Sequence, residues 1–112
     1  MATDAQSIDF ILEQGAGAGQ LTARKMFGEF GLYLDGKIIG LICDDTLFLK
    51  VSEAGRRLLG EPIMAAAYTG AKPSFNISLD ACEDRDWFIE LLQATYRGLP
   101  APKPKKATKN GT

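Results

Sequence analysis

The 112-residue sequence contains no histidine, two cysteines and no apolar run long enough to cross a membrane. Without histidine, the chain lacks the commonest general base, the usual partner of a serine or cysteine nucleophile, and the most frequent transition-metal ligand. Two thiols are too few for a zinc site built from cysteine alone. We therefore predict that the protein is not an enzyme and binds no cofactor.

The sequence also lacks the signals of membrane insertion and secretion. Its longest nearly continuous apolar run, Ile38 to Cys43, is far shorter than the roughly 20 residues of a membrane-spanning helix. Met1 to Ser7 does not have the basic and then apolar layout of a signal peptide. Two distant cysteines do not make the disulfide framework of a small secreted domain. These observations predict a cytoplasmic protein with reduced thiols and no membrane contact.

The two cysteines differ in their predicted surroundings. Cys43 ends an apolar strand, which predicts a small buried side chain. Cys82 stands near a predicted helix start, where the positive end of the helix dipole would lower the pKa of a thiol. A thiol-dependent activity at Cys43 or Cys82 is therefore one alternative function.

The charges are unevenly distributed along the chain, which has 13 basic and 14 acidic residues. Four of the lysines lie beyond Gly98: Lys103, Lys105, Lys106 and Lys109. Setting them aside leaves 9 basic against 14 acidic residues in 1–98, a net charge of −5, which disfavours a broad nucleic-acid face on that part. We predict one folded domain over residues 1–98 and a disordered Pro/Lys-rich tail over 99–112. Nucleic-acid binding through the four tail lysines is a second alternative function.

The segment from Arg24 to Lys50 alternates in hydrophobicity with a period of two, interrupted by turn residues. Asp35-Gly36 is a pair strongly favoured in tight hairpin turns, and Asp44-Asp45 marks a second turn. This pattern predicts an antiparallel β-meander. The strand between the turns is expected to be central because both of its faces are apolar, with Ile39, Leu41 and Cys43 on one and Ile38, Gly40 and Ile42 on the other. In the next strand, Leu47, Leu49 and Val51 are predicted to point to the buried side and Phe48, Lys50 and Ser52 to a solvated side.

Three helices are predicted around this sheet. The first spans 3–14 with Thr3 or Asp4 as its cap, and the second spans 52–59. The third follows Asp80, which forms a capping arrangement with Glu83, and its apolar residues recur at three- and four-residue spacing. Residues 74–79 alternate as a further strand, while 62–73 fit either a loop or a partly helical segment. The predicted fold class is α+β, a two-layer arrangement of helices on an antiparallel meander sheet.

Polar side chains exposed by the meander form the candidate partner-binding surface. They are Arg24, Lys25, Tyr33, Asp35, Lys37 and Lys50. Basic residues beside an aromatic ring occur in protein interfaces, and an unpaired edge strand can pair with a partner or a second copy. We therefore expect a protein partner or a homodimer, while a solvated sheet face is the other interpretation of the same residues.

The sequence of residues 23–55 resembles the N-terminal domain of the TfoX/Sxy family. It is ARKMFGEFGLYLDGKIIGLICDDTLFLKVSEAG. The matching elements are Arg24 to Gly28, Gly31 to Tyr33, Asp35-Gly36 and Leu47 to Val51. The resemblance implies an α+β domain over residues 4–98 with an architecture similar to type III secretion chaperones. It also implies a regulatory, protein-binding module, because full-length members resemble competence regulators that act with the cyclic-AMP receptor protein at promoters. We expect a stand-alone domain without the family's second, C-terminal domain, and no family active site carries over.

Overall fold

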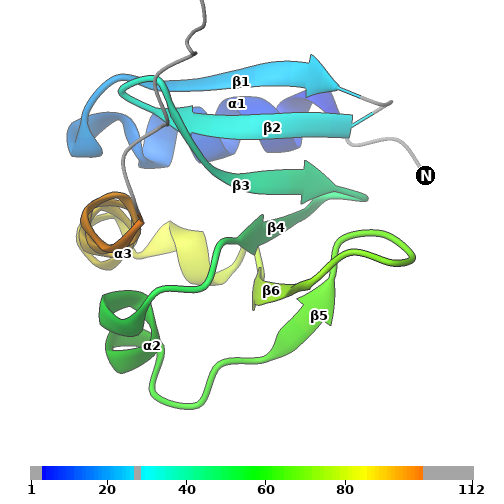
Figure 1. Cartoon of the computed structure of the whole chain (residues 1–112). Helices are drawn as coiled ribbons and strands as arrows, with labels where there is room; N and C mark the ends of the chain where they lie inside the picture. Colours follow the sequence, from blue (N-terminus) through cyan, green and yellow to red (C-terminus); the bar gives the residue numbers. More distant parts are fainter. Residues whose placement is uncertain (1–3, 27–28, 100–112) are drawn as a thin grey trace, which may run out of the picture.

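A computed structural model describes residues 4–26 and 29–99, and these ranges contain one antiparallel sheet with helices packed on it (Figure 1). In chain order the elements are α1 (Ala5–Gln14), the 3-10 turn η1 (Ala16–Ala18), β1 (Leu21–Met26), β2 (Glu29–Leu34), β3 (Lys37–Cys43), β4 (Thr46–Leu49), α2 (Glu53–Leu59), β5 (Met64–Ala66), β6 (Pro73–Ile77), the 3-10 turn η2 (Ala81–Glu83) and α3 (Arg85–Gly98). The predicted α+β fold is confirmed. Thr3 and the four tail lysines lie outside the described residues.

Two tight turns connect the strands of the predicted meander, one between β2 and β3 and one between β3 and β4. Asp35 and Gly36 have φ angles of 49° and 85°, and Asp44 and Asp45 have 51° and 59°, so both turns use the left-handed region that matches the twist of a hairpin. The Asp45 carboxylate accepts hydrogen bonds from the backbone N–H of Asp4 at 2.7 Å and from the Ser7 hydroxyl at 3.0 Å. The second turn therefore also fixes the start of α1.

The strands lie in the order β1-β2-β3-β4-β6-β5, so β3 is central, as predicted. Its predicted alternation is wrong at one point. Tyr33 pairs with Ile38 and Leu32 pairs with Gly40, which leaves Ile39 as the extra residue of a β-bulge. Ile39 consequently packs in the core, while Ile38 shares the opposite face with Leu41. Periodicity within β3 alone cannot reveal this shift, because the partner strand sets the register.

The core lies between one face of the sheet and the helices. Sheet and helix residues of the core cluster include Leu32, Leu34, Ile42, Leu47, Leu49, Phe75, Ile77, Ile11, Phe88, Leu91 and Leu92. Figure 1 shows α1 behind β1 and β2. Arg56 of α2 lies over the ring of the core residue Phe75, 5.6 Å from its centroid, so α2 is on the same side of the sheet. All three α-helices of the described ranges therefore cover a single face.

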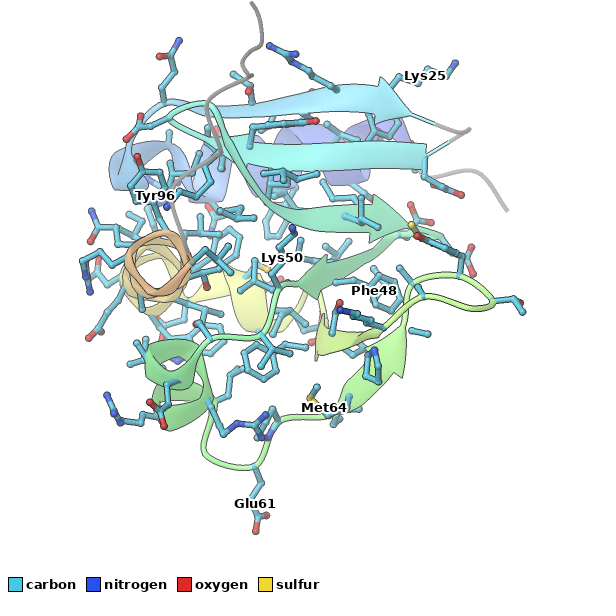
Figure 2. All side chains as sticks on the ribbon, in the orientation of Figure 1. Lys25, Phe48, Lys50, Glu61, Met64 and Tyr96 are labelled. Carbon is cyan, nitrogen blue, oxygen red and sulfur yellow. The ribbon has the colours of Figure 1, made fainter. Side chains whose placement is uncertain are left out.

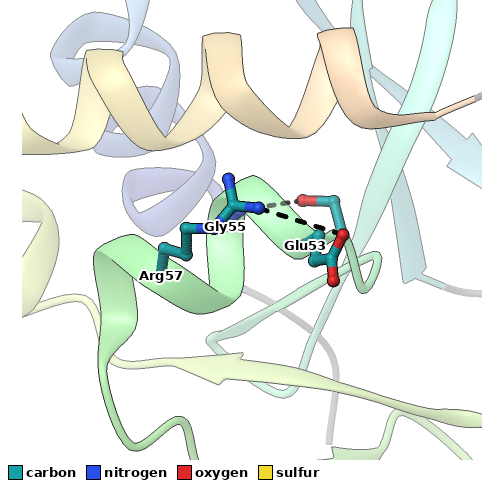
Figure 3. A network of polar contacts seen from close by, with 4 residues as sticks. Glu53, Gly55 and Arg57 are labelled. Atoms are coloured by element: carbon teal, nitrogen blue, oxygen red, sulfur yellow. Dashed lines mark hydrogen bonds and ion pairs between the residues drawn. The ribbon is translucent and has the colours of Figure 1, made fainter.

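The strand β4 ends at Leu49, earlier than the alternation predicts. Val51 is 39% exposed, because the chain leaves the sheet and Ser52 begins the next helix. The Ser52 hydroxyl accepts a hydrogen bond from the backbone N–H of Gly55 at 3.1 Å, and Glu53 pairs with Arg57 at 3.9 Å (Figure 3). The predicted second helix is confirmed, while the expected placement of Val51 on the buried side is wrong.

The segment that the sequence left undecided, 62–73, contains the short edge strand β5, which pairs with β6. The predicted cap of the third helix is also corrected. Asp84 caps α3 by accepting a hydrogen bond from the backbone N–H of Trp87 at 3.2 Å, whereas Asp80 makes no side-chain cap bond and precedes η2. Asp80 and Asp84 are both possible caps. The chain forms η2 between them, with Cys82 fully buried, so α3 begins only after Asp84.

Candidate functional site

The face of the sheet away from the helices, here named the open face, carries Arg24, Tyr33, Ile38, Leu41, Phe48 and Lys50. The strand register sets Tyr33 beside Ile38 and Leu41 beside Phe48, each alternating with core residues. These four apolar side chains are half-buried and lie outside the core cluster. Figure 2 labels Phe48 and Lys50 in the view where α1 lies behind the sheet. In the described part of the chain, no helix packs on this face.

One end of the open face bears a cation stacked on an aromatic ring. Arg24 is exposed, and its guanidinium carbon lies 5.2 Å from the centroid of the Tyr33 ring. This cation–π contact keeps the guanidinium close to the sheet, and because Arg24 is exposed the group remains accessible to a partner. Arg24 and Tyr33 are thus two predicted surface residues that the structure brings together.

The other end of the open face contains a hollow of about 520 Å³. Its apolar lining includes Leu41, Val51 and Leu99, and the loop between β5 and β6 closes one side with Tyr68. The lining also includes two lysines, Lys50 and Lys72, and both are exposed. The hollow thus places two lysines beside the apolar side chains of Leu41 and Val51, which lie outside the core cluster.

Lys37, a predicted surface residue, is used inside the fold. Its Nζ donates hydrogen bonds to the backbone oxygens of Tyr96 at 2.9 Å and Leu99 at 3.0 Å. It also lies 4.1 Å from the centroid of the Tyr96 ring. The last carbonyls of a helix have no partner within the helix and carry its negative dipole end, so a cation here ties β3 to the end of α3.

Asp35 and Lys25 are also placed apart from the open face. The Asp35 carboxylate accepts a hydrogen bond from the backbone N–H of Gln20 at 2.8 Å, which holds the hairpin turn against the chain that enters β1. Lys25 pairs with Phe30, a residue packed on the core, so the register puts its side chain on the helix side of the sheet, where it is exposed. Of the six predicted surface residues, the open face carries Arg24, Tyr33 and Lys50.

The TfoX N-terminal domain family model matches residues 13–99, a range that includes all six strands and α3. The chain belongs to this family. It is also similar to a protein of Spirochaeta aurantia described as an uncharacterized 12.7 kDa protein in the trpE 5' region, with 39% identity over 107 residues that cover 96% of this chain and 92% of the relative. The open face and the hollow lie within the matched range.

The thiols of this TfoX N-terminal domain are both buried. Burial raises the pKa of Cys82 to about 12, and its Sγ donates to the backbone oxygen of Ser78 at 3.5 Å. Burial, followed by the charges of Glu29 and Asp44, raises the pKa of Cys43. The expected lowering at Cys82 is therefore wrong, because this residue lies in the short turn η2 and not at the start of α3. A raised thiol pKa disfavours the nucleophilic thiolate.

Two further findings bound the chemistry of the domain. Within residues 4–26 and 29–99, no group of three or more histidine, cysteine, aspartate or glutamate side chains is arranged to hold a metal ion. No helix in the same ranges is long and apolar enough to cross a membrane.

The sequence did not indicate that Ile38, Leu41, Tyr68 and Lys72 would lie at this surface. For Lys72 no sequence pattern could have done so, because the loop that carries it follows an edge strand of only three residues, too short to show an alternation.

Proposed function

We propose that this TfoX N-terminal domain is a non-enzymatic module that binds a protein partner through its open face. The observation that carries the proposal is the apolar row formed by Tyr33, Ile38, Leu41 and Phe48 outside the core. An antiparallel sheet with one solvated face ordinarily has polar side chains on that face. Burying four adjoining apolar side chains against a partner is more favourable than leaving them in contact with water.

The composition of the open face supports a protein as that partner. Tyrosine, phenylalanine and arginine are enriched in protein interfaces, and the centre of an interface is apolar while its rim is polar. The open face has this layout, with Ile38, Leu41 and Phe48 in the middle and Arg24 and Lys50 at its margins.

Membership of the family supports a regulatory role for this contact. The resemblance to competence regulators implies that such domains act through other proteins in the cytoplasm, in connection with transcription. We propose the same general task here, with a protein partner as the first object to identify and a second copy of the chain as the other possible occupant of the open face.

Photo-cross-linking in the native cell tests the proposal. The photoreactive residue p-benzoylphenylalanine replaces Phe48 on the open face in one variant and the exposed Glu90 of α3 in a matched control. Light should give a discrete adduct from position 48 and not from position 90, and its mass distinguishes a partner from a homodimer. If a correctly folded variant gives no adduct from position 48, or the same adducts from both positions, the open face is not the binding surface.

A further inference from the structure

The hollow at the end of the open face differs in charge from the domain around it. Residues 1–98 have a net charge of −5, yet the described residues that line the hollow include Lys50 and Lys72 and no acid. On the strands of the open face, the acid in the described ranges is Glu29, at the beginning of β2. Most other acids lie on the helices, on the hairpin turns and around η2, so the hollow is a local positive site.

We propose that this hollow binds an acidic and apolar segment of a partner protein. The segment would place an apolar side chain against Leu41 and Val51 and its carboxylates at Lys50 and Lys72. This inference rests on the proposed function and names the chemistry of the partner. The hollow is open to solvent and has a volume of about 520 Å³, which gives room for one or two side chains of a bound segment.

Both lysines are available for such a contact. They are exposed, and among the described residues neither one takes part in a salt bridge. Lys37 shows the contrast, since its ammonium group is already bonded to the end of α3. Carboxylates of the bound segment would each form an ion pair with Lys50 or Lys72 at the edge of an apolar surface, where partial exclusion of water strengthens the pairs.

Charge complementarity favours this occupant over the others. A second copy related by a two-fold axis through the hollow would bring Lys50 and Lys72 close to their own equivalents, and like charges repel. Residues 100–112 of the chain contain four lysines and no acid, so this segment has the same sign as the hollow. A nucleic-acid backbone would meet the repulsion of the −5 domain beyond the hollow.

Peptide binding by the full-length chain tests the inference. The probe is a fluorescein-labelled eight-residue peptide that alternates aspartate or glutamate with leucine, compared with an amide peptide in which asparagine and glutamine replace the acids, and with oligothymidylate. Anisotropy should show that the acidic peptide binds, that added salt weakens it, and that the other two bind more weakly. Equal binding of the amide peptide, tighter binding of oligothymidylate, or no binding of the acidic peptide overturns the inference.

Matched variants assign the binding to the hollow. Lys50→Ala/Lys72→Ala should weaken the acidic peptide about three- to tenfold, as expected for two solvent-accessible ion pairs. Lys50→Arg/Lys72→Arg should restore most of the affinity. The control Lys25→Ala/Arg97→Ala removes the same charge from exposed positions elsewhere and should change affinity less than twofold. Equal weakening in the test and control pairs would mean that only net charge matters and would overturn the inference.

The photo-cross-linking variant separates this inference from the proposed function. Lys50→Glu/Lys72→Glu is added to the chain with p-benzoylphenylalanine at position 48. Loss of the partner adduct, with the adduct kept in a Lys25→Glu/Arg97→Glu control, supports an acidic partner segment. An adduct that survives the reversal overturns the inference and leaves the proposed function standing. If the parent chain forms no adduct at all, the proposed function fails and the inference fails with it.

Discussion

Replacement of Lys37 by methionine should lower the free energy of unfolding by about 2 kcal/mol. Methionine keeps most of the aliphatic stem, so the variant removes mainly the ammonium group and its contacts. Two hydrogen bonds, of 2.9 Å to Tyr96 and 3.0 Å to Leu99, are lost together with the contact to the Tyr96 ring at 4.1 Å. The two hydrogen bonds are only partly buried, so we assign each of them about 0.7 kcal/mol and the ring contact about 0.5 kcal/mol.

Urea unfolding measures this effect through Trp87, the single tryptophan, which is half-buried near the start of α3. In a domain of this size, a loss of about 2 kcal/mol corresponds to a fall of about 10 °C in Tm. Lys50→Met is the matched control, because it removes the same charge from an exposed position, and it should change stability by less than about 0.5 kcal/mol. Equal stability of the two variants would refute the structural role of Lys37 and would return this residue to the candidate partner surface.

Two further predictions follow from the corrected cap and the buried thiol. Asp84→Ala should cost about 1 kcal/mol in urea unfolding because it removes the cap bond to Trp87, whereas Asp80→Ala should cost less than about 0.5 kcal/mol; the reverse order would restore Asp80 as the cap. Burial raises the pKa of Cys82 to about 12 from an unfolded value of 9.0, so its contribution to stability is complete below about pH 9 and decreases as the pH rises toward about 12. Stability should therefore fall by roughly 1 kcal/mol more from about pH 8 to about pH 10 in the parent than in Cys82→Ala, and parallel profiles would contradict the assignment.

Much of the fold follows from local chemistry and was predictable from the sequence. Asp35-Gly36 favours a turn with positive φ wherever it lies between alternating strands, and the structure uses it so. The spacing of apolar residues correctly predicted α3, because Phe88, Leu91 and Leu92 lie on one side of a helix and this side is buried. Ser52 caps α2 through a hydrogen bond within its own turn. Each of these features depends on residues close together in the chain.

The remaining features depend on distant parts of the chain. The residues next to Lys37 in the sequence give no sign of a structural role. That role depends on the hydrogen bond to the backbone oxygen of Leu99, which lies 62 positions later in the chain. The bulge at Ile39 depends on how β2 pairs with β3, and the hollow joins Lys50 to a loop beyond α2. Of the six residues in the candidate surface, Arg24, Tyr33 and Lys50 share the open face, and the sequence alone could not show which face of the sheet each residue would occupy.

The strand order has a consequence for how binding and folding are linked. β1 to β4 pair with their neighbours in the chain, whereas β4 and β6 pair through three residue pairs after the chain has closed a long loop around α2 and β5. This seam joins a hairpin array of local pairings to a unit whose pairing requires closure of a longer loop. Lys50 stands on one side of it and Lys72 on the other. A ligand held by both lysines would bridge the seam, so binding would slow its opening and protect its amides from hydrogen exchange, and the stability of the domain would rise with the logarithm of the ligand concentration above its Kd.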